Sequence, residues 1–134
     1  MTKIVWSDKL SFGIPVIDSQ HQHFVELMDL AYDAFYKKET KEELAILLEN
    51  IKEYTISHFE TEEKYFDLFK YENADEHKQA HLLLKEQLLN LMKKFEIDGT
   101  KIMPELIDFL EDWLVSHLEF QDKKYVTCFK EHGL

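Results

Sequence analysis

The sequence contains no arginine and only one cysteine, and each scarcity excludes a class of protein. All 16 basic residues are lysines, set against 27 acidic residues, for a formal net charge of -11. Arginine makes most bidentate contacts to phosphates and bases, and an acidic surface repels polyanions and anionic lipids. We therefore expect no nucleic-acid partner. The single cysteine, Cys128, cannot pair within the chain, which fits a reducing compartment.

Glycine and proline are also scarce, at three and two residues. No segment approaches the roughly 20 consecutive apolar residues of a membrane-spanning helix, and the first residues lack the apolar stretch of a signal peptide. We therefore expect a cytoplasmic protein that does not insert into membranes. Its 134 residues suffice for one domain with a buried core, and its mostly charged solvent-facing positions favour a monomer.

Apolar residues recur every three or four positions along most of the chain, which predicts an all-α fold. We expect four helices joined by short turns, at about residues 18–38, 41–69, 74–96 and 104–122. Asn73 or Asp75 would cap the third helix, and Pro104 suits the first turn of the fourth. Such a set of helices is typical of an antiparallel up-down four-helix bundle.

The two ends of the chain lie outside this helical pattern. Residues 1–17 are expected to form an extended N-terminal arm across the bundle, and residues 123–134 a short helical tail. Apolar side chains would anchor the arm, namely Trp6, Phe12, Ile14 and Val16. The bundle itself would then span residues 18–122.

Five of the seven histidines occupy positions that point them toward one place. His58 and Glu62 are four residues apart, as are His77 and His81, so each pair shares one face of a helix. Burying such groups among leucine and phenylalanine is costly unless each finds a partner. Imidazoles with a minority of carboxylates suit iron, zinc, copper or nickel better than calcium or magnesium. The simplest interpretation is two metals bridged by carboxylates, with seven donors: His21, His58, Glu62, His77, His81, His117 and Asp122.

Other polar residues near these positions are expected to lie outside the cluster. His23 is about 200° around the helix from His21, and Glu63 points about 100° away from Glu62. His132 lies in the tail, so we expect all three side chains to be solvated. Asp18 stands near a helix start, where a carboxylate caps the helix or interacts favourably with its dipole.

These motifs, in this order, resemble the hemerythrin family, and in particular its single-domain bacterial members. The resemblance covers essentially the whole chain, as one domain of residues 1–134. It rests on the arm from Trp6 to His21, on His58-Phe59-x-x-Glu62-Glu63, on His77-x-x-x-His81, and on Trp113-Leu114-x-x-His117-x-x-x-x-Asp122.

The resemblance implies a non-haem di-iron centre with a bridging oxo or hydroxo group. One iron would take His77, His81 and His117, and the other would take His21 and His58. Glu62 and Asp122 would bridge the two irons. The cofactors implied are therefore two iron ions.

The step from His117 to Asp122 departs from simple helical periodicity. Five residues advance a regular helix by about 140°, so Gln121 would be better phased. Asp122 is assigned on the resemblance to the family. We expect the helix to be locally widened, or to end, at this point.

The resemblance implies reversible binding of dioxygen, for transport, storage, delivery to an oxygen-using enzyme or sensing, by a protein that is not itself an enzyme. Four apolar residues beside the donors are candidates for the oxygen-pocket wall, or merely for the core: Phe59, Trp113, Leu114 and Leu118. The alternative is a di-iron oxidase or reductase acting on ferrous iron, nitric oxide or peroxide. A purely structural zinc site is disfavoured because such sites are usually rich in cysteine.

Overall fold

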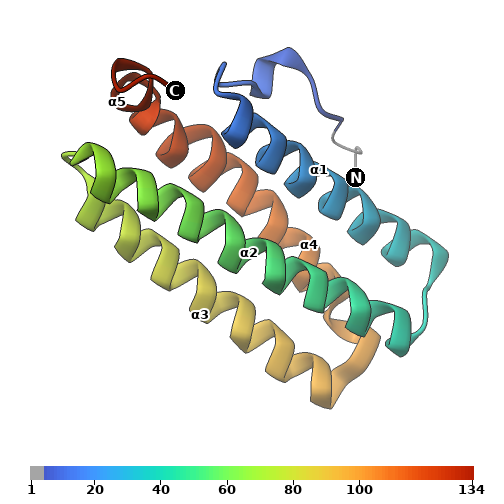
Figure 1. Ribbon diagram of the computed structural model, residues 1–134. Helices are drawn as coiled ribbons and strands as arrows, with labels where there is room; N and C mark the ends of the chain where they lie inside the picture. The colour runs from blue at the N-terminus through green and yellow to red at the C-terminus, as the bar shows by residue number, and fades with distance from the viewer. Residues whose placement is uncertain (1–4) are drawn as a thin grey trace.

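The computed structural model describes residues 5–134, which form helices and contain no strand (Figure 1). Three long helices, α1 (Pro15–Lys37), α2 (Lys41–Phe69) and α3 (Ala74–Asp98), are followed by the short η2 (Gly99–Ile102). The fourth long segment joins α4 (Met103–Asp112), η3 (Trp113–Gln121) and η4 (Asp122–Tyr125), and it runs on into α5 (Val126–Glu131). Neighbouring segments are antiparallel, which confirms the predicted four-helix bundle.

Helices α2 and α3 begin in different ways. The Thr40 hydroxyl accepts a hydrogen bond from the Glu43 N–H at 3.1 Å, and the Glu43 carboxylate accepts one from the Thr40 N–H at 3.2 Å. This reciprocal pair is a capping box, which satisfies two free N–H groups at the start of α2. Asn73 occupies the N-cap position of α3, but its side chain makes no cap hydrogen bond. Asn73 is therefore at the predicted cap position, but the side-chain cap expected there does not form.

The N-terminal arm is shorter than expected, because α1 begins at Pro15. The fixed φ of proline suits the first turn of a helix, so the helix starts before Asp18. Asp18 does not cap α1: it accepts hydrogen bonds from the Phe12 N–H at 2.7 Å and from the Ser11 hydroxyl, and so holds the arm. The arm includes η1 (Asp8–Leu10), and its first four residues lie outside the described part of the chain.

Two apolar clusters fill the bundle. The larger cluster holds residues of all four long segments, including Phe59 and Trp113. The smaller cluster lies near α5 and contains Ile14, Ile17, Phe66, Tyr71, Tyr125 and Phe129. Ile14 therefore anchors the arm as expected, whereas Val16 is 36 % exposed and does not.

The fourth helical segment widens into a π-helix over η3. The N–H of Asp122 donates to the carbonyl of His117, five residues earlier, where an α-helix would use the residue four earlier. Residues five apart therefore fall on one face of the segment. The expected local widening is confirmed, and it accounts for the step from His117 to Asp122.

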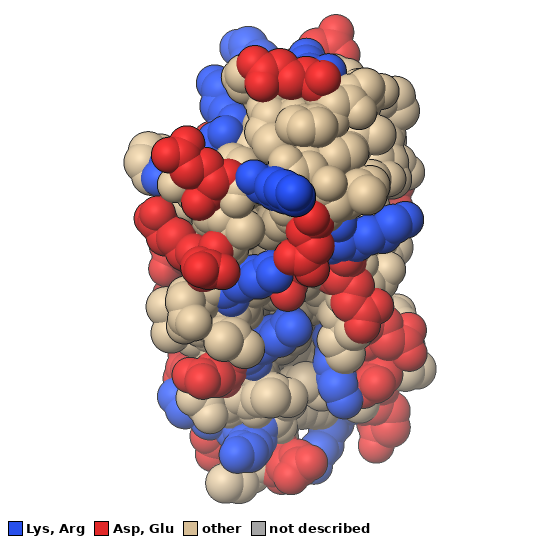
Figure 2. All heavy atoms as spheres, turned by 60° about the vertical axis from the view of Figure 1, so that its left-hand side comes forward, with Lys and Arg blue, Asp and Glu red and all other residues tan. Residues whose placement is uncertain are grey.

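Charged side chains of both signs are interspersed over the face of the bundle seen in Figure 2, with an uncharged area toward one end. The acidic excess is thus distributed on this face, among lysines, and does not form a single acidic patch. None of the helices built by residues 5–134 combines the length and the apolar character needed to cross a membrane.

Candidate metal centre

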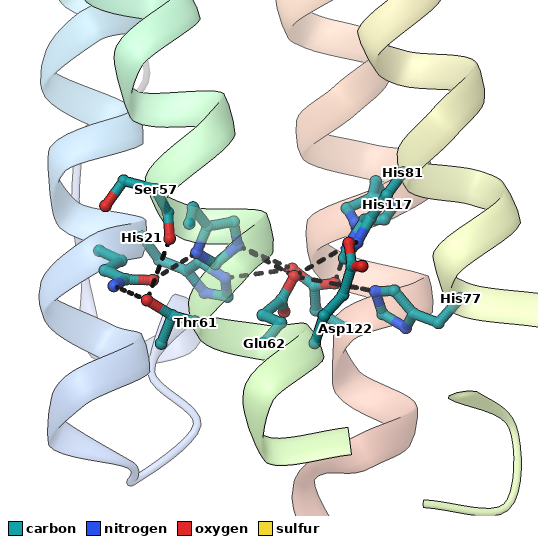
Figure 3. A network of polar contacts seen from close by, with 11 residues as sticks. His21, Ser57, Thr61, Glu62, His77, His81, His117 and Asp122 are labelled. Atoms are coloured by element: carbon teal, nitrogen blue, oxygen red, sulfur yellow. Dashed lines mark hydrogen bonds and ion pairs between the residues drawn. The ribbon is translucent and has the colours of Figure 1, made fainter. Parts of the chain in front are cut away.

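Seven buried polar side chains meet in the interior of the bundle (Figure 3). The structure brings together every donor predicted from the sequence: His21 from α1, His58 and Glu62 from α2, His77 and His81 from α3, His117 from η3, and Asp122 at the start of η4. None of them is more than 4 % exposed. Their role as metal ligands stays a prediction.

One side of the cluster presents three histidines to the two carboxylates. The Nε2 atoms of His77 and His117 lie 2.9 and 3.1 Å from Oδ1 of Asp122. The Nε2 atom of His81 lies 3.0 Å from Oε1 of Glu62. All three imidazoles therefore direct the same nitrogen inward.

The other side presents two histidines to the same carboxylates. His21 Nε2 lies 3.2 Å from Oδ2 of Asp122. His58 Nε2 lies 3.6 Å from that oxygen and 3.3 Å from Oε1 of Glu62. The two oxygens of Asp122 are thus divided, one toward each group of histidines.

The donors form two overlapping groups whose ligand atoms lie within 4.8 Å of one another. One group is Glu62, His77, His81, His117 and Asp122, and the other is His21, His58, Glu62 and Asp122. Figure 3 shows the two shared carboxylates at the centre, between His21 and the other three labelled histidines. This sharing is what two metal ions bridged by carboxylates require.

Several inward-facing atoms make no well-aligned hydrogen bond within residues 5–134, although Nε2 of His77 and of His117 lie at ion-pair distances from Asp122. They are Nε2 of His58, His77 and His117, Oε2 of Glu62 and Oδ1 of Asp122. An unpaired buried nitrogen or oxygen is costly, and here lone pairs of opposing groups face one another. A cation placed among them satisfies both sides at once. The donor set therefore fits a pair of metal ions.

Charge coupling within the cluster shifts the pKa values of its members. Burial lowers the pKa of His58 and of His117, but the nearby carboxylates outweigh burial and hold both pKa values above the ordinary value. Burial raises the pKa of Asp122, but His117, His21 and His58 outweigh it and hold that pKa well below its usual range. Without metal, the carboxylates therefore favour the protonated forms of His58 and His117.

Two of the predicted ligand histidines are also held by their outer nitrogens. Nδ1 of His58 donates to the amide oxygen of Gln20 at 2.6 Å, and Nδ1 of His81 donates to the carboxylate of Glu63 at 2.9 Å. The expectation that Glu63 is merely solvated was therefore wrong, although its side chain is 30 % exposed. A sequence signal was available, because metal-binding histidines usually donate their second N–H to a nearby acceptor, and Glu63 adjoins a predicted ligand.

The four predicted pocket residues are all buried in the larger apolar cluster: Phe59, Trp113, Leu114 and Leu118. Phe59 stacks on His81 with ring centroids 3.7 Å apart, and Trp113 meets His117 edge-on at 6.4 Å. Two of the four therefore contact predicted ligand histidines directly. Their role as the wall of an oxygen pocket stays a prediction.

His23 and His132 lie outside the cluster and are exposed, as expected. Gln121, the better-phased residue in a regular helix, is partly buried and lines a groove of about 740 Å³ between α3 and the fourth helical segment. His117 lies at the inner side of the same groove.

Fold and cluster together define a four-helix-bundle protein with a buried candidate site for two metal ions. Residues 13–129 match the family model described as the hemerythrin HHE cation binding domain. The chain belongs to the hemerythrin family.

Similar proteins match nearly the whole chain. Bacteriohemerythrin of Pseudomonas paraeruginosa is 35 % identical over 130 residues, which cover 97 % of this chain and 84 % of that protein. Bacteriohemerythrin of Clostridium acetobutylicum is 30 % identical over 128 residues, covering 91 % of this chain and 98 % of the other. Myohemerythrin-1 of Phascolopsis gouldii is 37 % identical over 78 residues, covering 58 % of this chain and 60 % of that protein.

The phasing of η3 gives a test with two neighbouring variants. If Asp122 is the predicted shared ligand, Asp122→Ala should weaken iron binding by at least about tenfold, because both metal positions would lose a ligand. Gln121→Ala should keep the wild-type iron content. Iron per chain, measured by mass spectrometry after dialysis, distinguishes them. Loss of iron from the Gln121 variant alone would show that the wrong residue was assigned.

The shifted pKa values predict how stability depends on pH in the metal-free protein. A raised imidazole pKa stabilises the fold fully at pH values below the unfolded pKa, and this contribution is lost as pH rises through the folded pKa. Each unit of pKa shift corresponds to about 1.4 kcal/mol. The lowered pKa of Asp122 acts in the opposite sense, because its contribution is lost only in acid, as pH falls through its folded pKa.

Metal-free protein should therefore have a lower free energy of unfolding at about pH 8.5 than at about pH 6. The higher pH lies about two units above the ordinary imidazole pKa. Iron-loaded protein should show the reverse trend, because protons compete with metal for the same nitrogens. Urea unfolding at both pH values measures the two trends. A metal-free protein that gains stability as pH rises would contradict this account of the imidazoles.

Proposed function

We propose that this protein binds dioxygen reversibly at a non-haem di-iron centre. His77, His81 and His117 would hold one iron, His21 and His58 the other, and Glu62 and Asp122 would bridge them together with an oxo or hydroxo group. The observation that carries the proposal is the shared position of the two carboxylates between unequal groups of histidines. When bound, the two irons would supply the two electrons that dioxygen takes up on binding and returns on release.

The unequal numbers of histidines suggest where dioxygen would bind. Residues on one side of the cluster offer three imidazoles, and residues on the other side offer two. The second position therefore has one protein nitrogen fewer and can accept a ligand from outside the protein. An open coordination position is what separates a ligand-binding metal site from a closed structural one.

The balance of imidazole to carboxylate favours reversible binding over oxidation of a substrate. Di-iron proteins of the ferritin-like type use four glutamates and two histidines. The anionic oxygens of the glutamates stabilise ferric iron. Here five imidazoles surround two carboxylates, and an imidazole bound to iron through Nε2 would be neutral. The smaller negative charge eases the return to ferrous iron that release of dioxygen requires.

The apolar surroundings would protect the bound gas. Phe59 and Trp113 cover ligand histidines, and Leu114 and Leu118 are buried in the same apolar cluster. We propose that these four side chains exclude water from the oxygen-binding position. The groove that reaches His117 offers a route from the surface to this region.

In this proposal the whole chain, residues 1–134, acts as one hemerythrin-like domain that carries, stores, delivers or senses oxygen. The alternative is a di-iron oxidase or reductase acting on ferrous iron, nitric oxide or peroxide. Visible absorption during addition and removal of dioxygen separates binding from oxidation, because a carrier returns dioxygen unchanged and an oxidase consumes it.

The test is to titrate anaerobically reduced, iron-loaded protein with dioxygen and then to remove the gas under argon. We expect visible absorption that develops with dioxygen and disappears on degassing, over repeated cycles. Irreversible conversion to the ferric form with consumption of oxygen would favour the oxidase. Absence of any spectral change in protein that holds iron would overturn the proposal.

Leu114→Ala tests the exclusion of water. The smaller side chain should admit water and speed the irreversible oxidation of the oxygenated form by roughly tenfold, which corresponds to about 1.4 kcal/mol in the barrier. Stopped-flow absorption measures the decay. Val115→Ala, which changes an exposed side chain on the same helical segment, is the matched control and should decay as the wild type does.

The Leu114 variant should also unfold more easily, by about 2 to 5 kcal/mol, because truncation leaves a cavity in the core. The decay is therefore measured at a temperature where both variants remain folded. Equal decay rates in the two variants would remove Leu114 from the pocket wall.

A further inference from the structure

The outer nitrogens of two ligand histidines bond to partners of different charge. His81, on the three-histidine side, donates from Nδ1 to the carboxylate of Glu63 at 2.9 Å. His58, on the two-histidine side, donates from Nδ1 to the neutral amide of Gln20 at 2.6 Å. Neither partner belongs to the seven donors, so each acts on the site only through a histidine.

A chain of hydrogen bonds fixes the orientation of the Gln20 amide. The Thr61 hydroxyl donates to the carbonyl of Ser57 at 3.0 Å, which leaves its oxygen free to accept. The amide NH₂ of Gln20 donates to that oxygen at 3.0 Å. The amide oxygen therefore faces His58, whose Nδ1 must carry the proton. The lone pair of Nε2 is then directed inward, toward Glu62 and Asp122.

Glu63 is one of three residues of α2 that contact the imidazole of His81. Phe59 stacks on the imidazole ring with an interplanar angle of 7°, Glu62 approaches Nε2, and Glu63 accepts from Nδ1. These residues stand at i, i+3 and i+4, so they share one face of the helix. Lys78, which lines the same surface pocket as Glu63, donates to Asp67 at 2.7 Å.

A carboxylate partner changes the electronic character of an imidazole more than an amide does. By drawing the Nδ1 proton toward itself, an anionic acceptor makes the opposite nitrogen a stronger donor to a metal. A stronger donor stabilises the ferric state and lowers the reduction potential, and a neutral amide has a smaller effect.

We propose that Glu63 and Gln20 are positioning residues that make the two metal positions electronically unequal. Glu63 makes the three-histidine position richer in electrons and favours ferric iron there. Gln20 keeps His58 in the correct tautomer without adding charge, so the two-histidine position returns to ferrous iron more readily. This inference rests on the proposed di-iron function, and it assigns the difference between the two positions to residues outside the ligand set.

The test exchanges the charges of the two partners while preserving an acceptor at each place. Glu63→Gln removes the negative charge, and Gln20→Glu adds one beside His58. The matched controls are Glu60→Gln on α2 and Gln22→Glu on α1, which make the same charge changes at exposed positions. The reduction potentials of the iron-loaded proteins are measured by spectroelectrochemistry, with iron content and thermal unfolding measured in parallel.

Glu63→Gln should shift the ferric-to-ferrous equilibrium about tenfold toward ferrous iron, which is about 59 mV for a one-electron couple. Gln20→Glu should shift it in the opposite direction by a similar factor. Each control should move the potential by much less, because its charge is exposed and screened. Iron content should stay at the wild-type level in Glu63→Gln, since the amide oxygen still accepts from His81.

A purely structural role for Glu63 would leave the potential of Glu63→Gln equal to that of Glu60→Gln, and that result would overturn the proposal. Should Gln20→Glu hold no iron, the comparison of Glu63→Gln with Glu60→Gln decides by itself. These potentials are measured without oxygen. A wild-type protein that binds iron but does not bind oxygen reversibly therefore overturns only the proposed function, whereas one that binds no iron overturns both.

Discussion

Two carboxylates buried among five imidazoles impose the constraint on which the rest of this structure depends. Glu62 and Asp122 are fully buried, in a bundle whose other interior side chains are mainly leucine, isoleucine and aromatic residues. An unpaired carboxylate in such surroundings would be heavily destabilising. Every long helical segment contributes at least one side chain that compensates this cost. The bundle and the site are therefore not separable parts.

The π-helix is the local consequence of that constraint. Asp122 must direct one oxygen toward each group of histidines while His117, on the same segment, also faces inward. A regular helix would turn Asp122 about 140° away from His117. The wider turn of η3 brings both onto one face, and its i→i−5 hydrogen bond keeps the backbone satisfied. π-Turns of this kind are often found at functional sites.

The residues around the seven donors also orient the buried imidazoles and pair with their outer nitrogens. Aromatic rings orient the imidazoles, and acceptors on the outer nitrogens fix their tautomers. Gln20 and Glu63 do so with different charges, and under our proposal this difference would set the redox balance of the two metal positions. The chain belongs to the hemerythrin family, and these two partners lie outside its seven candidate ligands.

The sequence by itself determined the helical class, the approximate helix bounds and the identity of the seven polar residues that meet in the core. Periodicity sufficed for the helices and for two pairs of donors, His58 with Glu62 and His77 with His81, because residues four apart on an amphipathic helix must share a face, whereas Asp122 was assigned on the resemblance to the family. It did not determine the start of α1, since the conformation of Pro15 outweighed the carboxylate of Asp18 as a boundary signal. Nor did periodicity select Asp122 over Gln121, because it assumes a constant turn.

Only the tertiary structure decided three matters: that the fourth segment widens at Asp122 and does not end there, that the two oxygens of Asp122 are divided between unequal groups of histidines, and that Gln20 and Glu63 pair with particular imidazoles. The physical reason is the same for each. These features depend on distances between side chains of different helices, and spacing along one helix carries no information about the partner that packing places opposite.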